Sequence, residues 1–157
     1  LSLPDGLLLQ IVGMCCINET VSAAILSEML RNAERGLVHD TIQQILRDEI
    51  GHGRLGWAHL AQAVDNENRP LLAKALPSLL QNAFKDELFE QPDINDPDLL
   101  VAPFGAVPRA TRFAFFEAAL LDLVFPGLER FDVDTQEARA WLASRSGNSA
   151  REHEERV

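Results

Sequence analysis

The sequence predicts an all-α domain, and three observations lead to that fold class. Apolar residues recur at three- and four-residue steps along most of the chain, no stretch alternates apolar and polar residues as a strand would, and turn-forming residues separate the periodic segments. With 157 residues, 46% of them hydrophobic, the chain is long enough for one domain with a substantial core. We expect residues 1–145 to form this domain and residues 146–157 to form a flexible polar tail.

Capping and turn residues set the boundaries of the expected helices. Gly36 is a typical C-terminal stop for a first helix, Asp40 is the expected N-cap of a second, and Pro70 suits the first turn of a third. Pro77 should kink that third helix. The expected helices cover approximately Leu7–Arg35, Asp40–Val64, Pro70–Phe89, Arg109–Val124 and Thr135–Ser144.

The C-terminal half carries three further turn and capping patterns. A long loop is expected over Gln91–Pro108, because this stretch contains four prolines and three aspartates. Pro126 and Gly127 should interrupt the fourth helix. Asp134, with Glu137 three residues later, resembles an N-cap with a capping box for the last helix.

Charge and composition exclude several classes of partner. A formal net charge of −10 and a pI of about 4.8 argue against binding of nucleic acid or of an anionic membrane. No apolar run reaches the length of a membrane span and the N-terminus lacks a basic segment, so we expect a cytoplasmic protein without a signal peptide. The adjacent Cys15 and Cys16 lie in an apolar helical segment and are interpreted as small core residues in a reducing compartment.

Two of the expected helices carry acids on the stripe that should face the core. On the second helix, Glu49 and His52 are three residues apart and share a face with apolar neighbours. On the first helix, Glu19 lies in the middle of a similar stripe. A charged glutamate in such a position is costly unless it is paired or binds a metal. Two inward acids and one imidazole on adjacent helices therefore indicate a metal site.

This pattern resembles the second half of a ferritin-like di-iron carboxylate protein. In that family one glutamate from each of two helices joins a Glu-x-x-His motif from each of two others. Glu19 matches the single glutamate, Glu49 and His52 match the paired motif, and the separation of 30 residues (49 − 19) suits two helices and a tight turn. The resemblance implies a ferritin-like half bundle over Leu7–Val64, followed by additional C-terminal helices.

The resemblance also implies a chemistry. Mixed carboxylate and imidazole ligands suit iron or manganese. The expected cofactor is two iron ions per complete site, with manganese as the alternative, and the expected activity is oxygen- or peroxide-linked redox chemistry such as that of a ferroxidase or another di-iron oxidoreductase. No residue is assigned a catalytic role beyond Glu19, Glu49 and His52 as metal ligands.

The chain departs from the family because it contains no second Glu-x-x-His motif. The missing ligands could come from an upstream half-domain, since the sequence starts at a leucine and not at a methionine. They could also come from a homodimer, in which each copy would supply three ligands to a site on the two-fold axis.

Two other interpretations stay open beside the metal site. A lone histidine on a helix is more often a hydrogen-bonded core residue, so the chain could be a metal-free helical scaffold or protein-interaction module. The segment from Gly51 to Gly56 also satisfies the G-x-G-x-x-G pattern, but no β-branched strand precedes it, which argues against a dinucleotide site. Three glycines within a helix cost about 1 kcal/mol each, so close helix packing or room beside a metal should offset them.

Overall fold

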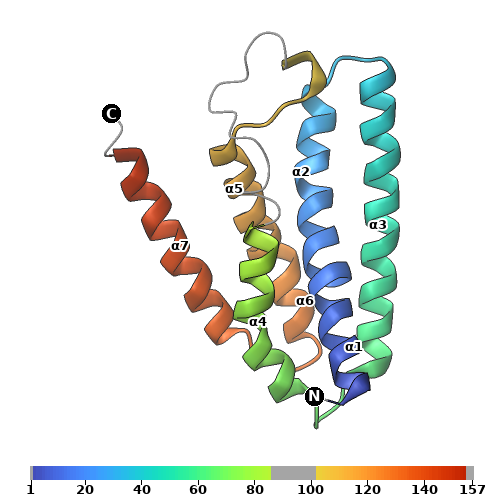
Figure 1. Ribbon diagram of the computed structural model, residues 1–157, viewed down its shortest axis with the longest axis vertical. Coiled ribbons are helices and arrows are strands. Elements are labelled where there is room, and N and C mark those ends of the chain that lie inside the picture. Colours follow the sequence, from blue (N-terminus) through green and yellow to red (C-terminus); the bar gives the residue numbers. More distant parts are fainter. Residues whose placement is uncertain (1, 86–101, 155–157) are drawn as a thin grey trace.

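The computed structural model describes residues 2–85 and 102–154, with the side chains of residue 102 and of residues 146–154 left aside. Every regular element in these ranges is helical, which confirms the all-α prediction (Figure 1). In chain order the elements are α1 Leu3–Ile11, the π-helical turn η1 Val12–Asn18, α2 Glu19–Asn32, α3 Leu37–Ala63, α4 Arg69–Phe84, the 3-10 turn η3 Ala102–Phe104, α5 Arg109–Ala119, the π-helical turn η4 Leu120–Val124, α6 Phe125–Glu129 and α7 Gln136–Glu154.

The first three elements form one continuous helical rod over Leu3–Asn32. It starts earlier than the predicted Leu7, because the Ser2 hydroxyl caps the first turn by accepting the Asp5 N–H at 3.3 Å. Halfway along the rod, the Glu19 N–H donates to the carbonyl of Met14, five residues back instead of four. This wider turn shifts the buried face relative to the predicted stripe. The buried rod residues are Leu8, Val12, Cys16, Ile17, Val21 and Ile25.

A short connection reverses the chain into α3, which runs antiparallel to α2 along its whole length (Figure 1). The prediction that Asp40 is the N-cap was wrong. Gly36 occupies that position with φ 149°, and Asp40 lies in the first turn, where an acid still complements the helix dipole. The predicted end near Val64 is confirmed, since Val64 is the C-cap residue.

The remaining helices cover the rod on the sides away from α3. Helix α4 packs against η1, helix α5 packs against α2, and helix α7 packs on α4. Their buried side chains form one continuous hydrophobic core with the rod. The largest fully buried members are Phe116, Phe125, Ile17, Leu60, Leu72, Leu76, Leu80, Leu120, Leu128 and Leu142. By contrast, α3 lies at the edge of the bundle and contacts mainly the rod (Figure 1).

Two predicted boundaries in the C-terminal half were wrong. Pro126 does not interrupt the fourth helix, because the π-helical turn η4 precedes it and α6 continues to Glu129. A wider turn accommodates a proline that has no N–H to donate to the preceding turn. The last helix extends to Glu154, ten residues beyond the predicted Ser144. Residues 91–101 of the predicted loop, and the predicted last turn of the third helix, fall outside the described ranges.

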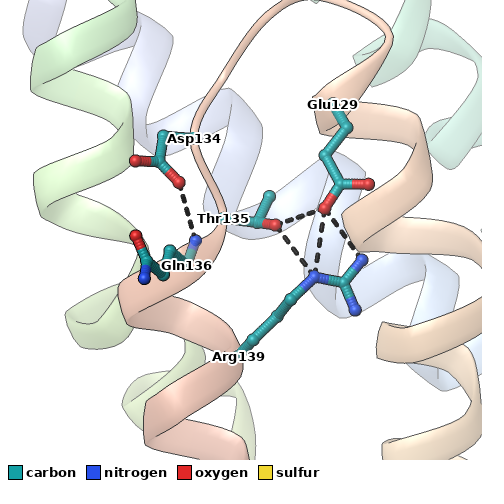
Figure 2. Close-up of polar contacts among 5 residues, drawn as sticks. All are labelled: Glu129, Asp134, Thr135, Gln136 and Arg139. Atoms are coloured by element: carbon teal, nitrogen blue, oxygen red, sulfur yellow. Dashed lines mark hydrogen bonds and ion pairs between the residues drawn. The ribbon is translucent and has the colours of Figure 1, made fainter.

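A polar cluster fixes the connection between α6 and α7 (Figure 2). The buried Thr135 hydroxyl donates to Glu129, and Arg139 donates to the same Glu129 oxygen at 3.0 and 2.8 Å. The Asp134 carboxylate accepts the Gln136 N–H at 2.8 Å, but Asp134 is not the expected N-cap residue, because Thr135 directly precedes α7 and its carbonyl accepts the Arg139 N–H at 2.8 Å. The pKa of Glu129 is lowered by its hydrogen bonds, most by the bond from Thr135 and next by the bond from Arg139.

The rod also corrects one expectation from hydropathy. By length and composition, Leu3–Asn32 is long and apolar enough to cross a membrane, so the prediction that no apolar run reaches that length was wrong. The core helix of a helical bundle and an N-terminal targeting segment share these properties. In this fold, side chains such as Val12, Ile17 and Val21 are fully buried against the other helices.

Candidate metal centre

Glu19, Glu49 and His52 converge at the seam between α2 and α3. Each offers one potential ligand atom, and these atoms all lie within 4.8 Å of one another. The His52 Nδ1 atom is 3.7 Å from the Glu19 Oε1 atom. Glu19 is the first residue of α2, directly after the π-helical turn, whereas Glu49 and His52 lie in the middle of α3. The residues predicted as metal ligands are therefore brought together by the antiparallel packing of two consecutive helices.

Gly56 of α3 allows the close approach of the helices at this point, whereas a Cβ atom on Gly53 would make only ordinary contacts. A Cβ atom on Gly56 would overlap the Cys15 side chain and would lie 3.0 Å from the Cys15 carbonyl carbon. A Cβ atom on Gly53 would lie 3.7 Å from the Cys15 carbonyl oxygen and 3.9 Å from the Glu19 Cβ atom. The expectation that close packing offsets the helical cost of these glycines is confirmed for Gly56. Gly51 differs, because nothing lies within 4 Å of its Cβ position.

The ligand atoms lie less deeply than a core-facing stripe predicts. The side chain of Glu19 is 20% exposed, Glu49 is half-buried, and the side chain of His52 is 57% exposed. The reason is the edge position of α3, whose face beyond the rod has no covering helix in the described part of the chain. The centre is thus open to one side of the bundle and closed by α2 on the other.

A groove of about 320 Å³ borders the two carboxylates on the side away from His52. Successive turns of α3 place His52 and Trp57 on opposite flanks of the seam, about 140° apart around the helix. The groove is lined by Glu19, Thr20, Ala23, Ala24, Ser27, Glu49, Ile50, Gly53, Arg54, Trp57 and Leu123. The sequence did not predict this groove, because Leu123 belongs to η4 and reaches α2 and α3 only through tertiary packing.

The other residues singled out in the sequence do not join the cluster. Cys15 and Cys16 are free thiols, and burial, followed by the neighbouring Cys15, raises the pKa of Cys16 to about 12, which keeps it protonated and a poor ligand. The glycine fingerprint lies in the middle of α3, with no strand before it in the described ranges. This placement excludes the strand–turn–helix context that a dinucleotide site needs.

Comparisons with known proteins add no assignment to this geometry. No family model matches the chain, and no match was found among characterised proteins or among solved structures.

Proposed function

We propose that the chain is a ferritin-like metal-binding protein in which Glu19, Glu49 and His52 bind iron or manganese as half of a two-metal site. The observation that carries the proposal is the convergence of three potential ligand atoms within 4.8 Å across two helices. The sequence spacing alone predicted these three residues as metal ligands. The short distances between their side chains come from the packing of α2 on α3.

The donor set fits a first-row divalent metal. Carboxylate and imidazole ligands bind such ions at about 2.0–2.2 Å, so two ligands of one ion lie about 3–4 Å apart. The separation of 3.7 Å between His52 and Glu19 is already in this range. Modest side-chain rotation would bring Glu49 within the same range, since its carboxylate lies in the same cluster.

Each residue has a distinct contribution to the proposed centre. Glu19 and Glu49 supply negative charge that compensates a cation, and both can bind through one or two oxygens. His52 supplies a neutral nitrogen donor from the exposed flank of α3. A bound iron or manganese pair would supply one-electron redox chemistry toward oxygen or peroxide. The groove beside Glu19 and Glu49 gives a small molecule access to the carboxylate side of the centre.

The open flank of α3 supports completion of the site by a second copy. Ile45 and Leu55 are 41% and 70% exposed, and helical spacing places both on the flank that carries His52. Two-fold packing of this flank would bring together two sets of three ligands and would bury these apolar side chains. Such a dimer should form more tightly with metal than without it. An upstream half-domain that covers the same flank is the alternative source of ligands.

A metal-free helical scaffold is the competing function, and one observation favours it. A protonated His52 could form an ion pair with Glu19 at the observed 3.7 Å, which would satisfy both groups without a cation. The two functions differ in their response to metal, because only a metal-binding bundle gains stability from an ion that binds the folded state.

Metal content tests the proposed function directly. Protein produced with iron and manganese available should contain one of them at a near-stoichiometric level by elemental analysis, and His52→Ala should lose most of it. His59→Ala is the matched control, because His59 lies two turns further along α3 and outside the cluster. Elemental analysis that finds no metal in the parent protein, or equal metal in both variants, would contradict the proposal.

A thermal melt with and without chelator separates the two functions. The metal-binding protein should melt at a lower temperature after chelation, and His52→Ala should show no response. For a ligand present at 100 times its dissociation constant, the expected stabilisation is about 2.7 kcal/mol. The scaffold predicts that chelator changes neither the melt of the parent nor the melt of His52→Ala.

A further inference from the structure

The groove beside the carboxylates combines apolar walls with a cationic side chain, Arg54, at its rim. Trp57, Ile50 and Leu123 provide large apolar surfaces, and Ala23 and Ala24 provide a smooth floor on α2. Its volume of about 320 Å³ lies at the lower end of the range for small-molecule sites. The span from Glu49 to Trp57 covers eight residues of α3, or about 12 Å. These dimensions suit a short acyl chain or a single aromatic ring.

Arg54 gives the groove a preferred charge. Its side chain is exposed at the rim, and within the described ranges no hydrogen bond or ion pair of Arg54 is observed. By contrast, Arg31 pairs with Glu28 and Arg139 pairs with Glu129. An unpaired guanidinium at the mouth of an apolar groove favours a planar anion, above all a carboxylate.

We infer that this groove binds a small amphiphilic carboxylate, with its head group on Arg54 and its apolar part between Trp57 and Leu123. A role for this carboxylate as a substrate of the metal centre rests on the proposed function. Binding of the carboxylate in the groove does not need that function. Glu19 and Glu49 line the same groove and repel a carboxylate, so a cation bound to them would favour the ligand. The geometry thus couples occupancy of the groove to occupancy of the metal site.

Trp57 offers a spectroscopic report on the groove. The sequence contains two tryptophans, and the second, Trp141 on α7, packs against Phe84 of α4 and does not line the groove. In a Trp141→Phe background the fluorescence of Trp57 alone reports on the groove. The indole of Trp57 packs edgewise on Gly127, where a Cβ atom would lie 2.7 Å from its ring.

The experiment titrates the Trp141→Phe protein with decanoate and with decanol, below their aggregation concentrations. Decanoate should change the Trp57 emission saturably, and Arg54→Gln should weaken its binding about tenfold while leaving decanol binding unchanged. Arg47→Gln is the matched control, because Arg47 is an exposed arginine of the same helix outside the groove. Circular dichroism of each variant establishes that its helices are intact.

A second variant separates this inference from the proposed metal site. Glu19→Gln combined with Glu49→Gln removes the charged ligands and also the repulsion, so metal-free decanoate binding should tighten about fivefold. Decanoate binding by this double variant would support the inference even if the parent protein held no metal. Equal decanoate affinity in Arg54→Gln and its parent, or no saturable change in the double variant, would overturn the inference. A Trp57 emission maximum that changes with protein concentration but not with decanoate would also overturn the inference, because a second copy of the chain would then fill the groove.

Discussion

The rod of α1, η1 and α2 packs on two sides, and the two interfaces use different chemistry. Toward α4 and α5 it meets large apolar side chains, among them Leu76, Leu80 and Phe116, all fully buried. Toward α3 it meets the buried Ile42 and Leu60 near the ends of the interface, but in the middle Gly56 approaches Cys15 and the carboxylates of Glu19 and Glu49 share one cluster. The first interface gains stability from buried apolar area. The interface with α3 brings two backbones close together and holds titratable side chains that contribute little to stability by themselves.

The strongest way to sharpen this contrast is to remove a large side chain from the apolar interface. Phe116→Ala should lower the free energy of unfolding by about 3–5 kcal/mol, because Phe116 is fully buried and packs edge-to-face on Phe84 with ring centroids 5.6 Å apart. Urea unfolding measures this loss. The metal content per folded molecule should stay at the parent level, and a loss of metal in the folded protein would show that the two interfaces are not independent.

The second test adds one methyl group to the α3 interface. Gly56→Ala should destabilise the protein by about 1–3 kcal/mol, because its new Cβ atom meets the Cys15 backbone and the helices must separate. The same separation should move Glu49 away from Glu19 and lower the metal content. Urea unfolding and elemental analysis on the same preparation would check both effects.

Gly51→Ala is the matched control for that substitution. Gly51 lies in the same helix, but open space surrounds its Cβ position, so alanine should stabilise the protein by up to about 1 kcal/mol through helix propensity. Opposite signs for the two variants would show that close packing, and not glycine itself, matters at the seam. Equal destabilisation by both would contradict the close approach of α3 and η1.

The smallest expected effect comes from the polar cluster beside the apolar core. Glu129→Gln should cost about 0.5–1 kcal/mol, since the pair with Arg139 is partly exposed and screened by solvent. The hydrogen bonds from Thr135 and Arg139 lower the pKa of Glu129 in the folded state below its ordinary value of 4.5. The stabilisation is therefore fully present above about pH 4.5 and is lost as the pH falls through the folded pKa. Urea melts of both proteins from pH 7 to pH 3 should show the difference shrink only at the acidic end.

The sequence predicted the convergence of Glu19, Glu49 and His52 because these residues lie on two consecutive helices. Helical period sets the face that Glu49 and His52 share, and the short turn after Asn32 forces α3 back along α2, so local rules suffice to bring Glu19 near them. The depth of the cluster could not be predicted in the same way. It depends on which helices cover α3, and that is a property of the whole bundle.

The groove and the π-helical turns show where sequence reasoning was insufficient. Trp57 and Leu123 are 66 residues apart (123 − 57), and no periodic pattern links them before η4 packs beside α2. A period of 3.6 residues likewise gives no sign that the Glu19 N–H donates to the carbonyl of Met14. The turn η4 displaced a predicted boundary by carrying a helix past a proline, whereas η1 shifts the buried face of the rod.

The turn η1 has a consequence for insertions and deletions in this chain. It behaves as one extra residue wound into the rod directly before Glu19, so loss of any single residue between Val12 and Asn18 could be absorbed by rewinding to ordinary α-helix. The loss would therefore leave α1 and α2 in phase and keep Leu8 in the core, whereas one further inserted residue would rotate α1 by about 100° relative to α2 and carry Leu8 away from the core. Glu19 would keep its place opposite α3. A deletion at this point would thus be tolerated, whereas an insertion would act on the anchoring of the N-terminal segment and leave the cluster of Glu19, Glu49 and His52 intact.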